Sequence, residues 1–137
     1  MRFWFALCCT LSLVVTLPVL ASPQAFDELA EQIRSGSRYA LHQQDQEALF
    51  AELKALLPAG DPDRESQYQR LSCAVTWQQN PAEGLQKVQQ WLTQSENPAH
   101  QSQYVQCQTE LYHLLGDAEK ADDSALAAVD LARQGND

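Results

Sequence analysis

Hydrophobic residues recur along this chain at helical spacing instead of alternating with polar ones. From Phe26 to Ile33 the apolar positions fall three or four residues apart, the stripe typical of an amphipathic helix. The same spacing returns over residues 49–57, 85–92 and 121–129. No run of β-branched residues bounded by turns indicates a strand. The pattern therefore predicts an all-α fold.

Turn residues divide this pattern into about six helices. Residues 58–62 carry two prolines and a glycine, Asn80-Pro81 and Asn97-Pro98 place a capping residue before proline, and Gly116 opens a short turn. We expect helices at roughly 23–42, 45–57, 62–79, 81–94, 98–115 and 117–133. The first could split at residues 35–37. The loops are short, so neighbouring helices should pack antiparallel as hairpins.

The chain also matches itself at an offset of 36 residues. Ser66–Tyr68 recurs as Ser102–Tyr104, and Ala82-Glu83 recurs as Ala118-Glu119. Core columns stay apolar at the same offset, as in Leu49, Leu85 and Ala121, or Leu56, Leu92 and Ala128. A single hairpin cannot bury its apolar face alone, so successive hairpins should stack and share a core. The first helices of the hairpins should then line one surface and the second helices the other.

The segment Leu114–Ala121 resembles the turn of tetratricopeptide repeats, and Ala125 and Ala128 fall where that family places small packing residues. The middle unit departs from this pattern, with Asn80-Pro81 at the turn and Gly84 or Leu85 at the alanine position. The family's usual period is also 34 residues. The resemblance covers roughly residues 26–133. It implies a right-handed solenoid of about three antiparallel hairpins, with units at 26–57, 62–94 and 98–133.

The N-terminal 21 residues read as an export signal. Arg2 is followed by an almost wholly apolar stretch to Leu20, Pro18 breaks any helix, and Val19–Ala21 offers small residues for cleavage. The alternative is an uncleaved inner-membrane anchor, because the apolar run is near the minimum spanning length. We expect a signal peptide at 1–21, a repeat domain at 22–137, and a periplasmic or secreted protein. An export signal before acidic hairpins is similar to the periplasmic sensor regions of bacterial GGDEF-type diguanylate cyclases, whose transmembrane helix and catalytic domain this sequence lacks.

The charge balance disfavours two classes of partner. Residues 22–137 carry all 18 acidic residues and, without Arg2, 8 of the 9 basic ones, so their formal charge is −10. Such a surface repels phosphate backbones and anionic lipids. We expect no nucleic-acid partner, and no membrane association after cleavage of the signal.

Two cysteines, Cys73 and Cys107, remain after residue 21, without the CxxC spacing of a redox motif or zinc site. Cys107 lies two residues before the repeat equivalent of Cys73. This half-turn offset would let the thiols of adjacent hairpins face each other. A disulfide between them is therefore one candidate. Two separate buried thiols are the interpretation that we favour from sequence.

The sequence holds no motif for catalysis, a metal or a cofactor. His42, His100 and His113 lie on different hairpins without ligand spacing, and we expect His113 to be partly buried. Asp122-Asp123 should belong to a solvated helix face. No nucleophile lies in a recognisable motif. We therefore expect a non-enzymatic chain without cofactor or metal.

A binding role is the prediction that remains. Tyr68 and Tyr104 occupy equivalent places, near the equivalent pair Arg70 and Gln106, and together these four could form a peptide-binding face. The alternative, which we favour for the tyrosines, is packing of hairpin against hairpin. The C-terminal helix lacks a polar cap and could self-associate. We predict an exported, sensor-like module for a protein or peptide partner. A truncated or accessory fragment of a membrane-bound diguanylate cyclase protein is the alternative, and a small periplasmic enzyme comes third.

Overall fold

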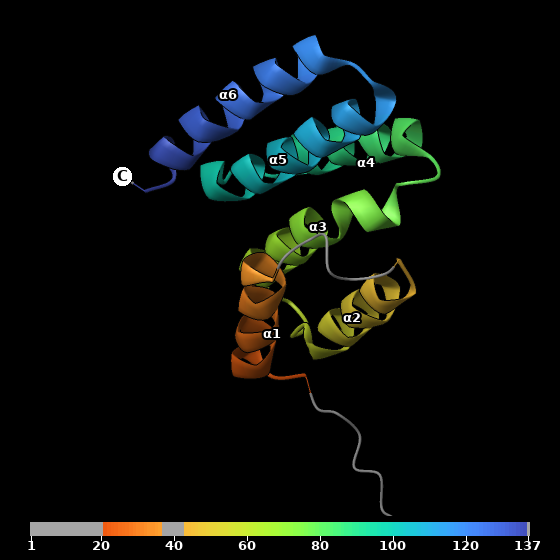
Figure 1. The fold of residues 1–137 in the computed structure, drawn as a ribbon. Coiled ribbons are helices and arrows are strands. Elements are labelled where there is room, and N and C mark those ends of the chain that lie inside the picture. Colours follow the sequence, from red (N-terminus) through yellow and green to blue (C-terminus); the bar gives the residue numbers. More distant parts are fainter. Residues whose placement is uncertain (1–20, 37–42, 137) are drawn as a thin grey trace, which may run out of the picture.

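The computed structural model describes residues 21–36 and 43–136, which form six α-helices and no strand (Figure 1). The all-α prediction is confirmed for this part of the chain. The predicted export signal lies almost wholly outside it. The helices are α1 (Pro23–Ser35), α2 (Gln43–Leu56), α3 (Pro62–Thr76), α4 (Pro81–Gln94), α5 (Pro98–Leu115) and α6 (Ala118–Gln134).

Local capping explains where most helices begin. Asp61, Asn80 and Asn97 each accept a hydrogen bond from a backbone N–H in the first turn of α3, α4 and α5, and proline follows each of them. Proline has no N–H to leave unpaired at this position, so the pair of cap and proline fixes the helix start. Ser22 before Pro23 begins α1 in the same way. These starts agree with the sequence prediction.

Two helix ends differ from the prediction. Helix α1 ends at Ser35, not at 42, and Gly36 continues in an extended conformation that ends the helical ladder. The predicted remainder, 37–42, lies outside the described residues. Helix α3 ends at Thr76, because the chain turns through 77–79 before the cap of α4. The α5–α6 turn is as short as predicted, since Gly116 adopts a positive φ of 76° that few other residues tolerate.

The core consists of two clusters that share α3. The first lies between α1 and α2, with Tyr68 and Leu71 of α3 packed against it; its buried members are Phe26, Leu29, Ala30, Leu53 and Leu56. The second joins α3, α4 and α5, and its buried members are Cys73, Val88, Tyr104, Cys107 and Leu111. Helix α3 packs against α1, α2 and α5, while α5 packs against α3, α4 and α6. Each helix pair thus covers apolar surface of the next.

Helices α3 and α4 make little direct backbone contact, so the prediction that these neighbours pack against each other as a hairpin is wrong for the unit 62–94. Trp77, in the turn after α3, contacts α4 instead. Gly84 of α4 lies against the side chain of Trp77 so closely that an added methyl group would sit 2.7 Å from Cγ of the indole. The same methyl would lie 3.0 Å from Cδ1 of Leu111. A glycine therefore replaces the small packing residue here because the indole fills its space.

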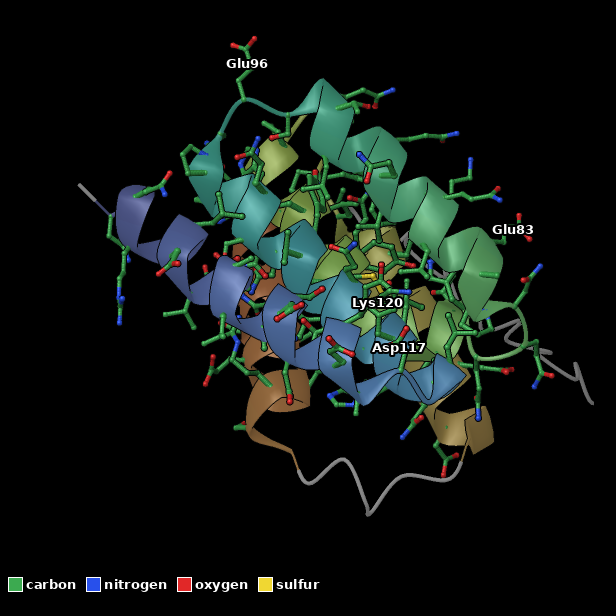
Figure 2. The ribbon with its side chains drawn as sticks, turned by 90° about the horizontal axis from the view of Figure 1, so that it is seen from above. Glu83, Glu96, Asp117 and Lys120 are labelled. Atoms are coloured by element: carbon green, nitrogen blue, oxygen red, sulfur yellow. A yellow bond between two sulfur atoms is a disulfide. The ribbon has the colours of Figure 1, made fainter. Side chains whose placement is uncertain are left out.

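Surface charges surround this core. Figure 2 shows Glu83 and Glu96 pointing away from the bundle near the two ends of α4, and Asp117 and Lys120 lying together at the start of α6. Asp117 caps α6 through the Lys120 N–H and pairs with the Lys120 ammonium at 3.0 Å. The described helices include none with the length and apolar character that crossing a bilayer requires.

Candidate binding groove

Three cavities adjoin along the side of the molecule formed by α1, α3 and α5, and Arg70 of α3 borders all of them. The first, of about 420 Å³, lies between α1, α2 and α3. The second, of about 260 Å³, lies between α3, α5 and α6. The third, of about 160 Å³, connects α1, α3 and α5. We call these three cavities together the groove.

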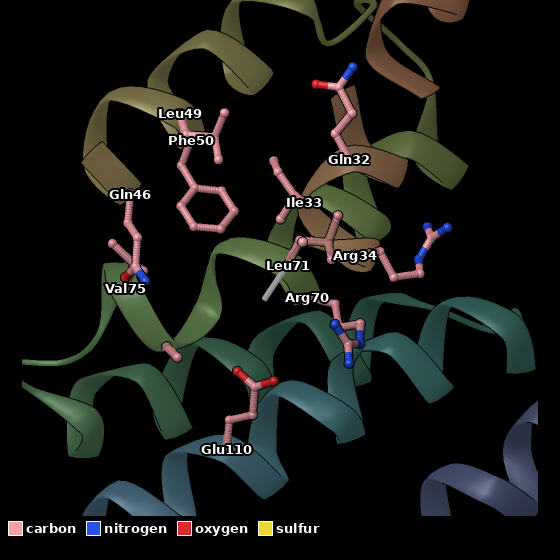
Figure 3. A pocket seen from close by; sticks show the side chains of 12 residues that line it. Gln32, Ile33, Arg34, Gln46, Leu49, Phe50, Arg70, Leu71, Val75 and Glu110 are labelled. Carbon is pink, nitrogen blue, oxygen red and sulfur yellow. The ribbon is translucent and has the colours of Figure 1, made fainter. Parts of the chain in front are cut away.

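The first cavity has an apolar floor (Figure 3). Ile33 comes from the end of α1, Phe50 from α2 and Leu71 from α3, and the side chains of Leu49, Ala74 and Val75 complete the floor. Polar side chains stand at its edge, among them Gln32, Gln46 and Glu110. An apolar cavity with a few polar groups at its border suits a large hydrophobic side chain of a ligand.

A chain of hydrogen bonds positions Arg70 in the groove. Arg70 Nε donates to Gln106 Oε1 at 2.5 Å, and Gln106 Nε2 donates to Ser102 Oγ at 3.3 Å. The buried Ser102 hydroxyl then donates to the backbone carbonyl of Ala128 at 2.9 Å. The chain runs from α3 through α5 to α6, so the guanidinium is held by three helices.

Of the four residues predicted as a binding face, only Arg70 and Gln106 come together in the groove. Tyr68 packs against the first core cluster and Tyr104 against the second. Tyr104 is 8% exposed, its ring lies 5.5 Å from that of Trp91, and burial raises the pKa of its phenol. The two tyrosines therefore pack one hairpin against the next, which was the alternative interpretation of their equivalent positions. Trp77 and Trp91 also pack against the second cluster.

Cys73 of α3 and Cys107 of α5 form a disulfide inside the second cluster, with their Cα atoms 5.6 Å apart. The expectation of two separate thiols is wrong in this structure. The half-turn offset between the two positions places one sulfur on each of the facing sides of α3 and α5. Both residues are almost fully buried, so the bond lies in the core and not in the groove.

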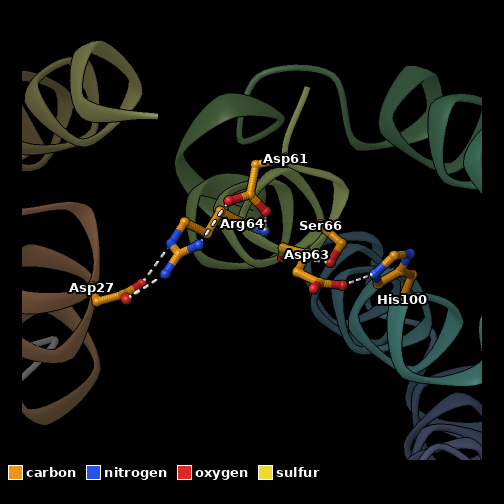
Figure 4. A network of polar contacts seen from close by, with 6 residues as sticks. All are labelled: Asp27, Asp61, Asp63, Arg64, Ser66 and His100. Atoms are coloured by element: carbon orange, nitrogen blue, oxygen red, sulfur yellow. Dashed lines mark hydrogen bonds and ion pairs between the residues drawn. The ribbon is translucent and has the colours of Figure 1, made fainter. Parts of the chain in front are cut away.

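Two polar contacts that sequence reasoning missed, one arginine–carboxylate ion pair and one histidine–carboxylate contact, join successive units (Figure 4). Arg64 of α3 makes a two-pronged contact with Asp27 of α1, at 2.9 and 2.6 Å. His100 Nε2 of α5 lies 2.5 Å from Oδ1 of Asp63 on α3. The second pair is the first shifted by 36 residues at both partners. The shared offset of 36 residues could have revealed both contacts from the sequence, although the basic residue changes from arginine to histidine.

Hydrogen bonding shifts the titration of the first pair. The Arg64 side chain holds the pKa of Asp27 below its ordinary value, mainly by donating hydrogen bonds to the carboxylate. It lowers the pKa of Asp61 in the same way, at 2.7 Å. The two carboxylates in turn raise the pKa of Arg64. Asp61 and Arg64 lie at the start of α3 and Asp27 lies on α1, and none of the three lines the groove.

The remaining candidates form no chemical site within the described residues. His113 lies exposed in the last turn of α5, so the prediction of partial burial is wrong. Asp122 and Asp123 are exposed on α6. His42 lies outside the described residues. No three His, Cys, Asp or Glu side chains of the described part gather as metal ligands would.

Comparisons with protein-family models, with curated proteins and with solved structures found no match for this chain.

Proposed function

We propose that this protein is an exported helical-repeat module that binds a protein or peptide in the groove, in the manner of a sensor domain. One observation carries the proposal: three cavities adjoin along α1, α3 and α5 and meet at Arg70. Adjoining cavities over successive helices suit an extended segment better than a compact small molecule.

The internal repeat of 36 residues supports the proposal of a helical-repeat module. The 36-residue columns correspond to equivalent places in the described helices, as in the buried small residues Ala30, Ser66 and Ser102. Helix α3 packs against both α1 and α5, and each of the second helices, α2, α4 and α6, packs against at least one of these first helices. Packing of successive first helices is a feature of a tetratricopeptide-like solenoid of hairpins, whose first helices line a concave surface; the weak contact between α3 and α4 departs from that pattern in the middle unit.

Export is supported by the disulfide and by the sequence of the first 21 residues. Disulfides persist in oxidising compartments such as the periplasm and are rare in the cytosol. A signal peptide at 1–21 would deliver the chain there. Both arguments favour a periplasmic or secreted protein.

The lining of the groove favours binding over catalysis. Its described side chains are amides, guanidinium groups and aliphatic or aromatic groups, with one carboxylate, from Glu110, and one hydroxyl, from Thr109. The Thr109 hydroxyl donates to the Val105 carbonyl at 3.0 Å, an ordinary helix contact. Such groups hold a peptide by hydrogen bonds and apolar contact.

An array of random dodecapeptides, probed with the purified protein, tests the proposal. We expect a subset of peptides to bind, and Gln67→Trp to abolish the binding because an indole at this position obstructs the third cavity. Gln86→Trp is the matched control: it places the same side chain on the exposed face of α4, outside the three cavities, and should leave binding intact. Thermal unfolding checks that both variants fold. Absence of any bound peptide, or equal binding by both variants, would refute the groove as a binding site.

A further inference from the structure

The third cavity has a charge opposite to that of the protein as a whole. The chain carries a formal net charge of −9. Yet the described residues lining this cavity include two arginines, three glutamines and no carboxylate: Arg34, Gln67, Arg70, Leu71, Gln103 and Gln106. A cationic segment of groove in an acidic protein attracts an anionic group locally and repels competing polyanions at longer range.

These polar side chains are repeat equivalents. Arg34, Arg70 and Gln106 are spaced by 36 residues, and so are Gln67 and Gln103. The two columns therefore present guanidinium and amide groups from successive helices along one line. A glutamine amide both donates and accepts hydrogen bonds, as does a peptide unit, and arginine pairs with a carboxylate through two parallel N–H donors. This combination fits an extended backbone that carries a carboxylate.

The apolar cavity adjoins this segment directly. Arg34, Arg70 and Leu71 border both cavities, so a ligand whose carboxylate lies at the arginines would place a neighbouring side chain over Ile33 and Phe50. Glu110 also borders the apolar cavity, and together with Arg70 it borders the second cavity as well.

We propose that the groove binds an extended peptide in which a carboxylate, facing Arg34 and Arg70, is followed closely by a large apolar side chain that enters the cavity between α1, α2 and α3. This assignment rests on the proposed function and specifies its ligand. Arg70 keeps its hydrogen bond to Gln106, which fixes the guanidinium in position before the ligand arrives.

Three matched sets of decapeptides test the proposal on the purified protein. The first set combines Asp or Glu with Leu, Met or Phe, the second replaces each acid by its amide, and the third replaces each acid by lysine. Every peptide is made with a free and with an amidated C-terminus, which separates a terminal carboxylate from a side-chain one. We expect the acidic set to bind about tenfold more tightly than the amide set, an advantage that should shrink with added salt.

Variants assign that preference to the groove. Arg34→Gln and Arg70→Gln should each bring the acidic and amide sets close to equal affinity. Lys87→Gln removes the same charge from the exposed face of α4 and should keep the preference. If Arg70→Gln does not fold, Arg34→Gln carries the test, because Arg34 is half exposed at the end of α1 and pairs with Glu31.

The outcomes separate the two proposals. Peptide binding without an acidic preference, or a preference that survives both arginine variants, would overturn the ligand assignment and leave the binding function standing. Absence of binding by every set would overturn both. A second copy of the chain is the other possible occupant. Sedimentation as a dimer that Arg34→Gln dissociates would show it and would also overturn the assignment.

Discussion

Reduction of the Cys73–Cys107 disulfide should cost a large part of the free energy of unfolding. The bond closes a loop with a sequence separation of 34 residues between α3 and α5. In the chain-entropy description, a loop of this length restricts the unfolded chain by about 3.8 kcal/mol at 25 °C. Since small domains are stable by about 5–15 kcal/mol, this contribution is a substantial share of the total.

Urea unfolding followed by far-UV circular dichroism, with and without reductant, measures the effect. For slopes of about 1–3 kcal/mol per molar urea, the midpoint should fall by roughly 1 to 4 M on reduction. Both cysteines are almost fully buried, so the samples must be reduced while unfolded and then refolded. The double variant Cys73→Ala with Cys107→Ala is the matched control. It should be at least as unstable as the reduced protein and should not respond to reductant.

A midpoint that reductant shifts by less than about 0.3 M would contradict the reasoning, because it would mean that the loop costs little to close or that the bond is absent. Mass spectrometry after alkylation of the unfolded, unreduced protein distinguishes these cases. If neither cysteine is alkylated, the disulfide is present and the estimate of its entropic contribution is wrong. If both cysteines are alkylated, the disulfide is absent.

Three further predictions concern packing and charge. Gly84→Ala should destabilise the protein by about 1 kcal/mol in urea unfolding, because the crowding of the new methyl group against the Trp77 indole outweighs the gain of about 1 kcal/mol in helix propensity. A variant more stable than the parent would contradict this. Leu111→Ala should cost about 2–5 kcal/mol because Leu111 is fully buried, whereas Leu126→Ala, at a side chain 68% exposed, should change stability by less than about 0.5 kcal/mol. Arg64 lowers the pKa of Asp27 in the folded state, so their contact stabilises the fold above the ordinary carboxyl pKa of 3.8, and this stabilisation is lost as the pH falls below that value. Arg64→Gln should therefore reduce the fall in the free energy of unfolding at acid pH, and an unchanged pH dependence would refute the pairing.

Helix class and most helix starts could be predicted from sequence because their causes are local. The pairs Asn80-Pro81 and Asn97-Pro98 determine a start by themselves, and the structure places α4 and α5 there. The end of α1 was harder to predict from the sequence. The sequence predicted a helix to residue 42 with a split at 35–37 as the alternative, and the helix ends at Ser35, before the extended backbone of Gly36.

The candidate site could be predicted only in part, because the offset of 36 identifies equivalent positions without saying which way each side chain faces. Arg70 and Gln106 meet in the groove, whereas Tyr68 and Tyr104 turn into two different cores. The contribution of Arg34 was missed because its column changes to glutamine at position 106. The exposure of His113 was not predicted, because its repeat equivalent, Trp77, is apolar and packs against the second cluster.

The disulfide makes the two sides of the groove mechanically unequal. A disulfide bonds α3 to α5, whereas α1 and α2 contact α3 without such a cross-link, through side-chain packing, the short connection 57–61 and surface contacts such as the Asp27–Arg64 pair. One wall, which carries Arg70, should keep its shape, while the wall that carries Phe50 should yield to an incoming side chain. A bound ligand would then stiffen mainly the compliant wall. Amide hydrogen exchange should slow first in α1 and α2, which would turn occupancy into a change in the dynamics of the N-terminal end.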